Sequence, residues 1–408
     1  MKWIACILGS LALITGAMAA GAQEWQELTA AEDLAGWQVL SGQWELDGGV
    51  IRGSAGPGEN AWLQYTAQEF ADLEITVEFR TPVPTNGGVQ FHSHWLPRTP
   101  LESGESPQDA PKVMYGYQAD VETRQRLSTG RLVCENVRGP IAETAPEAAG
   151  TLKQRDWNEM RIVARNGVIE VYLQGELANR TEDEMYRRGF LALQVFAFEM
   201  EEPVTVVEYR NLRVRELPQE AGWVDIFDGE SLNGWETYGE EKWYAEDGLL
   251  HGASGPKNSE GYVATTDSYR DFEFQGEVLM AGAGNYGFFF HVEITLREED
   301  GYPIISGMQV EIEPGYPTST AWMYESYKRG WLVVPDKTSL PCVALRPKEW
   351  NHLEVRVQDN HYTTWLNGIR VMDFVDDEKT TTEGFIAFQI HEGGADGILK
   401  RNLMVRPL

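Results

Sequence analysis

Cysteine is scarce in this chain, with three residues among 408. Cys6 lies in an apolar run at the N-terminus, which leaves Cys134 and Cys342 for the rest of the protein. The chain contains two similar copies of one segment, described below, and Cys134 aligns near Tyr324 rather than with the other cysteine. A structural disulfide would be expected in both copies. We therefore expect two buried free thiols, with a bridge between the copies as the alternative.

Basic residues are also few. Lys and Arg number 34 against 63 Asp and Glu, which gives a formal net charge of -29 at pH 7. Such an acidic surface argues against binding to nucleic acid or to an anionic membrane, and it favours neutral partners. Beyond the N-terminus, no apolar run reaches the ~18 residues of a membrane-spanning helix. A Gly-rich phosphate loop, a serine nucleophile elbow and an H-E-x-x-H zinc motif are absent as well.

The N-terminus is typical of a secretory signal. Lys2 precedes the apolar stretch 4–14, and small residues follow as Ala17-Met18-Ala19 and Ala20-Gly21-Ala22. A positive charge, an apolar centre and an A-x-A cleavage site are the parts of such a signal. We expect residues 1–22 to be removed and the mature protein to be exported to the periplasm or the extracellular space.

Two long segments of the chain resemble each other. Trp157-Asn158 begins a stretch that ends on Leu173-Gln174-Gly175, and Trp350-Asn351 begins a matching one that ends on Leu366-Asn367-Gly368. The spacing of about 190 residues is far longer than a solenoid repeat of roughly 20–50 residues. It indicates a duplicated domain. The expected divisions are a first domain at 23–217, a linker at 218–222 and a second domain at 223–408.

Apolar and polar residues alternate with a period of two through both copies. Leu73-Glu74-Ile75-Thr76-Val77 does so cleanly, as does Leu353-Glu354-Val355-Arg356-Val357, and Asn-Gly pairs at 166–167 and 367–368 mark turns. Helical periodicity is rare, and the stretch 181–188 is expected to make one short helical turn. The pattern predicts an all-β protein of two tandem jelly-roll β-sandwiches.

The same period sorts side chains onto the two faces of each strand. Met308 and Val310 fall on the core face of their strand, and Gln309 and Glu311 on the polar face. Two further strands place side chains on polar faces: Gly287, Phe289 and His291 in one, and Ala387, Gln389 and His391 in the other. If the three strands share a sheet, these groups meet on one polar surface with an aromatic rim.

Each of these polar residues also has a plain structural explanation. An outward Glu is usually a solvated group, and a lone His in a strand is usually structural. The Gln-x-acid pattern recurs in the first copy as Gln118 and Asp120, which favours a shared site. A metal site from His291, His391 and Glu311 lacks tight ligand spacing, so we expect no cofactor and keep a divalent metal as the alternative.

Several motifs in the second copy occur together in the order of a known family. They are Asn285-Tyr286-Gly287-Phe288-Phe289-Phe290-His291, Gly307-Met308-Gln309-Val310-Glu311-Ile312, Trp322-Met323-Tyr324-Glu325 through Arg329-Gly330-Trp331-Leu332, Glu349-Trp350-Asn351, Trp365-Leu366-Asn367-Gly368 and Phe388-Gln389-Ile390-His391. This set resembles the 3-keto-disaccharide hydrolase domain family, whose fold is similar to that of concanavalin A and laminin-G domains. The resemblance covers both copies and implies two concanavalin A-like sandwiches.

The resemblance also implies a chemistry, the cleavage of glycosides oxidised at carbon 3 by hydrolysis or elimination. A ketone at carbon 3 acidifies the proton on carbon 2, so a general base can remove it before the glycosidic oxygen leaves carbon 1. Glu311 and His391 are the candidate bases, and Glu325 is the candidate proton source. Hydrolysis by Glu311 and Glu325 is the alternative mechanism. The candidate substrate-binding residues are Gln309, Gln389, Arg329, Trp331, Asn285, His291, Trp365, Gln118, Asp120 and Glu135.

The two copies are not equivalent. Where the second has Gln389-Ile390-His391, the first has Gln194-Val195-Phe196, although it keeps Asp120 and Glu135. Loss of the late histidine predicts that the second domain carries catalysis on a carbohydrate substrate. A lectin-like protein that binds glycans without cleaving them is the first alternative, and an envelope or adhesion scaffold is the second. The sugar, the linkage and the oligomeric state stay open.

Overall fold

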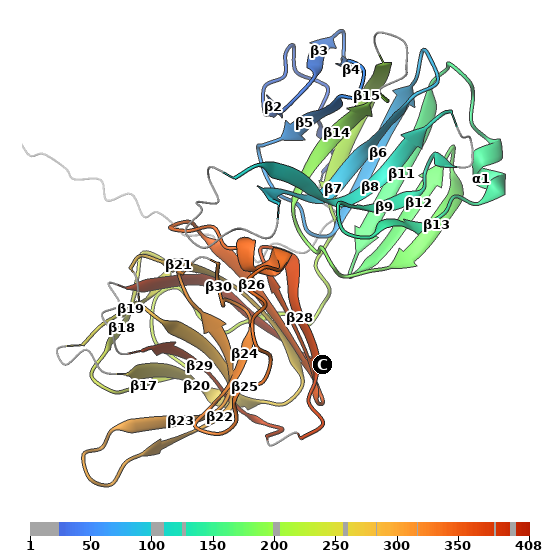
Figure 1. Cartoon of the computed structure of the whole chain (residues 1–408). Coiled ribbons are helices and arrows are strands. Elements are labelled where there is room, and N and C mark those ends of the chain that lie inside the picture. Colours follow the sequence, from blue (N-terminus) through green and yellow to red (C-terminus); the bar gives the residue numbers. More distant parts are fainter. Residues whose placement is uncertain are drawn as a thin grey trace, which may run out of the picture.

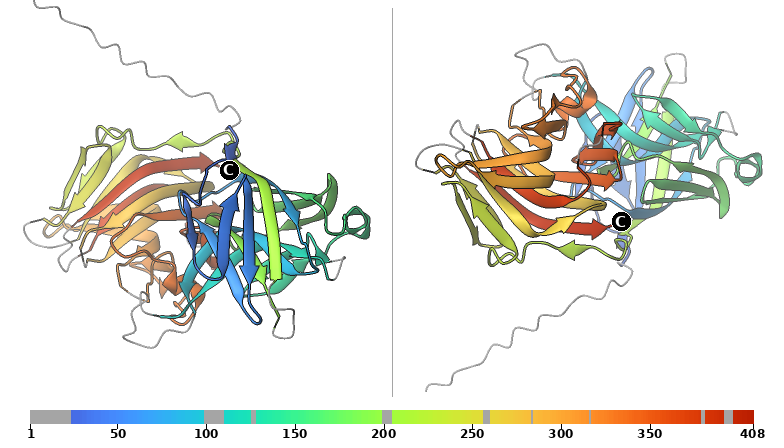
Figure 2. Two further views of the ribbon diagram at one scale, coloured as in Figure 1. Left: turned by 90° about the horizontal axis from the view of Figure 1, so that it is seen from above. Right: turned by 90° about the horizontal axis from the view of Figure 1, so that it is seen from below.

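The chain folds into two β-sandwiches, which lie one above the other in Figure 1 and side by side in Figure 2. The structure is a computed structural model that describes residues 24–98, 110–124, 128–198, 205–255, 260–282, 284–315, 317–378, 381–391 and 397–408. The expected signal segment 1–22 lies outside the described residues. The all-β, two-sandwich fold class predicted from the sequence is confirmed.

The first sandwich has two antiparallel sheets. One has the order β13-β12-β11-β6-β15-β4-β3, with β1 added beside β15, and the other β10-β9-β8-β7-β14-β5-β2. The bounds are β1 Gln26–Glu27, β2 Trp37–Val39, β3 Gln43–Asp47, β4 Val50–Ala55, β5 Asn60–Tyr65, β6 Leu73–Arg80, β7 Asn86–Pro97, β8 Lys112–Glu122, β9 Leu132–Glu135, β10 Gly139–Ala142, β11 Asn158–Arg165, β12 Val168–Leu173, β13 Glu176–Glu182, β14 Phe190–Phe196 and β15 Thr205–Glu216.

The second sandwich repeats this arrangement strand for strand. Its sheets have the orders β18-β19-β30-β21-β26-β27-β28, with β16 beside β30, and β17-β20-β29-β22-β23-β24-β25. The bounds are β16 Val224–Asp225, β17 Trp235–Tyr238, β18 Lys242–Glu246, β19 Leu249–Ala253, β20 Gly261–Tyr269, β21 Phe272–Met280, β22 Tyr286–Leu296, β23 Pro303–Ile312, β24 Met323–Ser326, β25 Gly330–Trp331, β26 Asn351–Gln358, β27 His361–Leu366, β28 Ile369–Val375, β29 Gly384–Ile390 and β30 Ile398–Pro407.

Period-two alternation puts the apolar side chains of each sheet between the two layers. In the second domain Phe274 stacks on Phe288 with ring centroids 4.2 Å apart, and Phe388 packs edge-on against Phe288 at 5.7 Å. Met308 and Val310 are fully buried in the same core, as the alternation predicted. Burial of apolar faces on two facing sheets stabilises each sandwich, at about 25 cal/mol per Å² removed from water.

The helical turn expected at 181–188 is wrong. Strand β13 runs through Glu182, and Tyr186 then forms an isolated antiparallel bridge with Ile369 of the second domain. The described α-helix of the first domain is α1, Pro146–Gly150. It begins with a proline in its first turn, where a backbone N–H has no partner within the helix. Pairing with β12 inside the first domain holds Thr181 and Glu182, and the bridge to the second domain holds Tyr186, in place of the predicted helical turn.

The segment after β13 binds the first domain to the second. Glu184 accepts two hydrogen bonds from Arg356 at 2.7 and 2.8 Å, and its carbonyl accepts one from Trp365 Nε1 at 2.8 Å. Arg187 pairs with Glu354 at 2.9 Å and lies over the Trp365 ring, 4.5 Å from its centroid. Trp365 was expected in a sugar site. That placement is wrong, because its side chain is buried in this contact on the other sheet.

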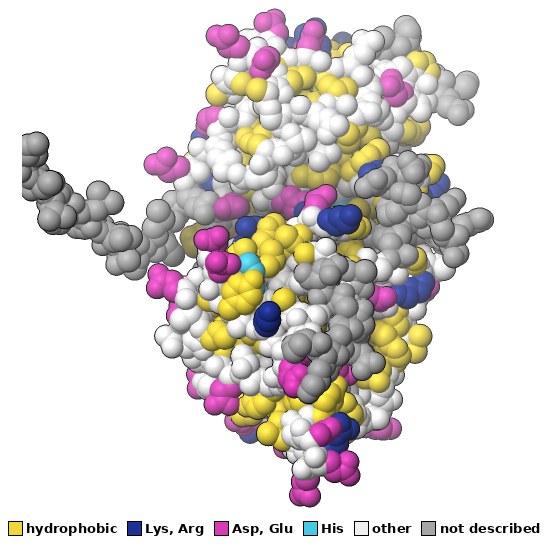
Figure 3. Space-filling model, turned by 90° about the vertical axis from the view of Figure 1, so that its left-hand side faces the viewer, with side chains coloured by type: hydrophobic (Ala, Val, Ile, Leu, Met, Phe, Trp, Pro, Cys, Tyr) yellow, Lys and Arg dark blue, Asp and Glu magenta, His cyan; other side chains and the backbone are white. Residues whose placement is uncertain are grey.

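Cys134 and Cys342 are buried free thiols, as expected. No helix in the described ranges has the length and hydropathy needed to cross a membrane. Asp and Glu side chains are spread over both domains on the face drawn in Figure 3, and do not gather in one patch.

Candidate active site

The polar face of the second domain centres on Gly287 in β22. Gly287 lies opposite Glu311 of β23 on one side and opposite Gln389 of β29 on the other. Tyr262 of β20 follows opposite Gln389. Residues directly opposite each other project from the same face of a sheet, so these side chains form one row. A Cβ at Gly287 would lie 3.0 Å from Gln309 Nε2 and 3.2 Å from Gln389 Oε1, so the glycine keeps this space open.

A second row lies next to the first and connects to it by hydrogen bonds. The backbone N–H of His391 donates to Asn285 O at 3.0 Å, and His391 Nε2 lies 2.9 Å from Glu260 Oε1. Tyr262 Oη donates to Glu260 Oε2 at 2.7 Å, and Gln389 Nε2 donates to Tyr262 Oη at 3.3 Å. The predicted residues Asn285, Gln389 and His391 thus lie together, joined by Glu260 and Tyr262.

Glu311 is the carboxyl at the centre of this face. Its side chain accepts hydrogen bonds from Asn285 Nδ2 and, at 3.0 Å, from Gln309 Nε2. Burial, with a smaller contribution from the charge of Glu313, raises the pKa of Glu311 to about 7, while the bond from Asn285 opposes the shift. A buried carboxyl that titrates near neutral pH can both accept and return a proton.

Glu260 is the residue that sequence reasoning missed. Although burial opposes its ionisation, hydrogen bonds from His391 and Tyr262 hold its pKa below the usual value. Glu260 is thus a carboxylate that orients His391. Its only sequence signal is that Glu260 and Tyr262 have one residue between them, at the start of a strand. The first domain has Asn60 and Trp62 at the matching positions.

Gln389 has a further property that suits ligand binding. It is 3% exposed, and its Oε1 is buried with no hydrogen-bond partner among the described residues. The matching Gln194 of the first domain is 4% exposed, and its Oε1 is also buried without a hydrogen-bond partner among the described residues. Buried amide oxygens are nearly always paired, so a hydroxyl of a bound molecule would satisfy them.

His291 does not lie on this face, contrary to expectation. The pairing of β22 with β23 shifts register between Phe290 and Glu293, and His291 sits in the bulge with φ 50°. Its ring packs beside Phe272, and its Nε2 is 2.5 Å from Arg270 O. A bulge inserts one residue and reverses which side the next side chains face. The first domain has the same bulge at its own histidine of this strand, also with positive φ.

Glu325 and Arg329 are likewise misplaced by the sequence prediction. Glu325 lies opposite Met308, a core residue. Its side chain therefore projects from the core face of the sheet, whereas Gln309 projects from the polar face. Its side chain is fully buried and ion-paired with Arg329, which also binds Asp376 at 2.7 Å. These two residues form a structural ion-pair cluster and do not meet Glu311.

Trp331 does lie on the polar face, at its edge. It is opposite Tyr324, which in turn is opposite Gln309, and the two rings meet edge to face with centroids 5.5 Å apart. Trp331 is 40% exposed. An exposed indole beside a row of amides and a carboxyl can stack on the apolar face of a sugar ring.

The first domain carries an altered version of the same face. Gln118 Nε2 donates to Asp120 Oδ1 at 2.8 Å, and Arg131 Nη2 binds Asp120 Oδ2 at 2.7 Å. Glu135 lies opposite Gly116 on this face, and burial, followed by the charge of Asp120, raises its pKa to about 7. Phe196 stands where the second domain has His391.

Glu135 and Glu325 are not counterparts, because Glu135 projects from the polar face of its sheet and Glu325 from the core face. The counterpart of Glu325 is Cys134, which lies opposite Tyr117 just as Glu325 lies opposite Met308. A shift of one residue moves a side chain to the other face of a sheet. The alignment of Cys134 near Tyr324 was one residue out for the same reason.

A comparison with known protein families identifies the repeated unit. The model of the 3-keto-alpha-glucoside-1,2-lyase-like domain matches residues 24–215 and again residues 222–406. The chain belongs to this family. Membership of this family supports a carbohydrate-active role for the protein.

Individual proteins that match the chain are only distantly similar to it. A 3-keto-disaccharide hydrolase of Bacteroides thetaiotaomicron is 30% identical over 177 residues, which cover 39% of this chain and 61% of that protein. A candidate glycosyl hydrolase from Parabacteroides distasonis superposes with a TM-score of 0.35 and 20% identity over 46% of this chain and 94% of its own. A carbohydrate-binding module from Bacillus subtilis superposes with a TM-score of 0.31 and 14% identity, over 42% of this chain and 95% of its own.

Metal ligands are the remaining question for this family member. Within the ranges that the structure describes, no three His, Cys, Asp or Glu side chains are grouped to hold a metal ion. The metal site kept as the alternative from the sequence does not form, because His291 faces the core while Glu311 and His391 stay on the polar face. The groups that remain together are Glu311 with its raised pKa, the ion pair of Glu260 with His391, and several amides.

Proposed function

We propose that the second domain cleaves glycosides of 3-keto sugars by elimination, with Glu311 as the general base. The observation that carries the proposal is a buried carboxyl held by two amides, with its pKa raised to about 7. A base matched to neutral pH removes a carbon-bound proton beside a ketone more effectively than an ordinary solvated carboxylate.

Glu311 takes the proton from carbon 2, and the electrons of that C–H bond form an enolate. The enolate oxygen accepts hydrogen bonds from the side-chain amides of Gln309 and Gln389. The enolate then reforms the ketone, a double bond forms between carbons 1 and 2, and the glycosidic bond breaks. His391, oriented by Glu260, gives a proton to the departing oxygen. Water adding across the new double bond would make the net result a hydrolysis.

The geometry disfavours the alternative hydrolysis by Glu311 and Glu325. That mechanism needs two carboxyl groups on either side of the same glycosidic bond. Glu325, its candidate second carboxyl, projects from the core side of the sheet and is ion-paired with Arg329. A sugar beside Glu311 cannot reach it.

A direct test uses the purified protein with a 3-keto-disaccharide and its unoxidised parent in deuterated water. We expect release of sugar from the keto substrate alone, an unsaturated product or deuterium at carbon 2, and loss of turnover in Glu311→Gln. Glu246→Gln, an exposed carboxyl on β18, is the matched control. Equal turnover of Glu311→Gln and the wild type would rule out this base.

Glycan binding without cleavage is the second candidate. It is favoured by the buried, unpaired Oε1 atoms of Gln194 and Gln389, which occur in both domains of the described chain. Binding of the same disaccharides with no release of sugar under any condition, with or without a chelator, would support this candidate over the first.

We also propose that the protein is exported, because residues 1–22 have the charge, apolar stretch and A-x-A site of a secretory signal. Mass spectrometry of the protein recovered from its host checks this. A mature N-terminus just after Ala22 is expected, and an intact Met1 on cytoplasmic protein would refute it.

A further inference from the structure

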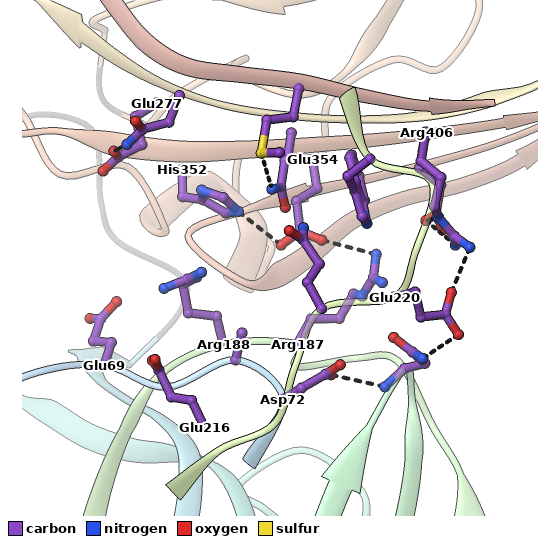
Figure 4. A pocket seen from close by; sticks show the side chains of 18 of the residues that line it. Glu69, Asp72, Arg187, Arg188, Glu216, Glu220, Glu277, His352, Glu354 and Arg406 are labelled. Carbon is purple, nitrogen blue, oxygen red and sulfur yellow. Dashed lines mark hydrogen bonds and ion pairs between the residues drawn. The ribbon is translucent and has the colours of Figure 1, made fainter. Parts of the chain in front are cut away.

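A cavity of about 660 Å³ lies between the two domains (Figure 4). Gln275 and His352 line its wall on the second domain, at the outer face of the sheet that contains β21, β26 and β30, and Trp350 lies beside them. Asp72 and Arg188 line its wall on the first domain. The cavity is therefore on the opposite sheet of the second domain from the candidate active site, and both domains are needed to enclose it.

The first domain has a smaller depression at the matching place. It measures about 230 Å³ and is lined by Thr76 and Arg213, which lie opposite each other, with Arg213 Nε donating to Thr76 Oγ1 at 2.8 Å. Gln275 and Met404 occupy these positions in the second domain and also lie opposite each other. Arg213, which spans the depression of the first domain, is thus replaced by the uncharged Met404 in the second domain. There the space is larger, and the first domain covers it.

Arg188 is the side chain that indicates a ligand. The other arginines around the cavity are held by carboxylates: Arg187 by Glu354 at 2.9 Å, Arg346 by Glu69, and Arg406 by Glu220 at 2.5 Å. Arg188 has no ion pair or side-chain hydrogen bond with any residue that the structure describes, and its Nε is buried (Figure 4). A guanidinium has five N–H donors, and leaving a buried one unpaired costs free energy.

The geometry points to a neutral saccharide as the ligand of this cavity, with Arg188 donating to its hydroxyl oxygens. The wall on the second domain offers amide and imidazole groups from Gln275 and His352, and an indole from Trp350, which together suit a ring with polar edges and an apolar face. A carboxylated sugar fits less well, because Asp72 and Glu216 also line the cavity.

This inference depends on the carbohydrate-active role of the family and not on the cleavage chemistry proposed above. The cavity would hold a second part of a long glycan, or a separate chain, while the polar face of the other sheet holds the reacting sugar. Unoxidised sugars can therefore be used as probes, since they are not cleaved under the proposed mechanism.

Met404 allows binding to be followed at this site alone, because its side chain lines the cavity. The protein is labelled with methyl-¹³C methionine, the Met404 signal is assigned with Met404→Leu, and maltose, trehalose and sucrose are titrated. We expect a saturable shift of the Met404 signal with at least one sugar. Arg188→Ala should weaken this binding roughly tenfold, the effect of about 1.4 kcal/mol from a lost charged hydrogen bond.

Controls separate this proposal from the proposed active site. Glu311→Gln should keep the Met404 response, and Arg180→Ala, an exposed arginine on β13, should keep it too. Gln275→Ala on the opposite wall is a second variant in case Arg188→Ala folds poorly. No shift of Met404 with any of the three sugars, an unchanged affinity in both variants, or tighter binding of glucuronate than of neutral sugars would overturn the assignment.

Discussion

Arg131 Nη2 lies 2.7 Å from Asp120 Oδ2 in the first domain, and the second domain has Trp322 in the place of this arginine. The backbone pairing fixes the equivalence, because Asp120 N donates to Arg131 O at 3.0 Å and Glu311 N donates to Trp322 O at 2.9 Å. The carboxyl of the second domain is thus buried without an arginine beside it, and its pKa rises to about 7. The missing arginine adds to the other differences between the two faces, which include Phe196 in the place of His391 and Asn60 in the place of Glu260.

Glu311→Gln should lower activity and raise stability. We expect kcat/KM to fall at least about 100-fold, since the general base is lost. The folded pKa of about 7 is above the ordinary value of 4.5, so folding favours the protonated form, and this stabilisation is present below pH 4.5 and lost as the pH rises through 7. The amide should therefore gain roughly 2 kcal/mol over the wild type at pH 8, and little at pH 4. Denaturant unfolding at both pH values measures this; an equal effect at both would contradict it.

The pH profile should report the same group. A base must be ionised, so kcat/KM should rise with pH through about 7. Glu313→Gln removes a negative charge that helps to raise the pKa of Glu311, so the rising limb should move to lower pH. Initial rates from pH 5 to 9 check the shift. A limb that stays in place would mean that another group controls the rate.

His391→Phe introduces the residue that the first domain has at this position. Under the proposed mechanism His391 protonates the departing oxygen, so its loss matters most when that oxygen is basic. With a disaccharide we expect a fall of about 100-fold or more, and with a 4-nitrophenyl 3-keto-glucoside less than about tenfold. Equal losses for the two substrates would exclude a role as the acid.

Glu325→Gln separates the two mechanisms. Glu325 is fully buried and paired with Arg329, so the amide should destabilise the second domain by about 3 kcal/mol. Turnover of the folded enzyme should stay within about threefold of the wild type, because the side chain faces away from Glu311. Activity is measured at a temperature where circular dichroism finds the variant folded. A loss as large as that of Glu311→Gln would restore hydrolysis by two carboxylates.

Lys400 is a buried lysine whose replacement should stabilise the protein. Its side chain is fully buried between Trp243 and Phe388, and burial lowers its pKa well below the usual value. The native state therefore binds fewer protons than the unfolded chain, which costs stability below pH 10.5. Lys400→Met should raise the free energy of unfolding by roughly 2 kcal/mol at pH 7 and by less near pH 10. A destabilised variant at pH 7 would contradict this account.

The alternation of side chains predicted much of the fold and part of the site. Gln309 and Glu311 on one strand, and Gln389 and His391 on another, are on the polar face as expected, because strict period two leaves no other choice in an unbroken strand. The prediction was wrong where the ladder is irregular. A bulge turns His291 toward the core, and a register offset of one residue sends Glu325 to the opposite side from Glu135.

The sequence by itself determined that the protein has two similar β-sandwiches and which side of most strands faces the core, since these follow from local periodicity and from the repeat. Only the tertiary structure decided which polar groups meet. Glu260 comes within 2.9 Å of His391 through pairing of β20 with β29, and Arg187 comes within 2.9 Å of Glu354 through the docking of one domain on the other. Contacts of this kind depend on strand register and on domain packing, which join residues more than 100 positions apart and leave no local pattern in the chain.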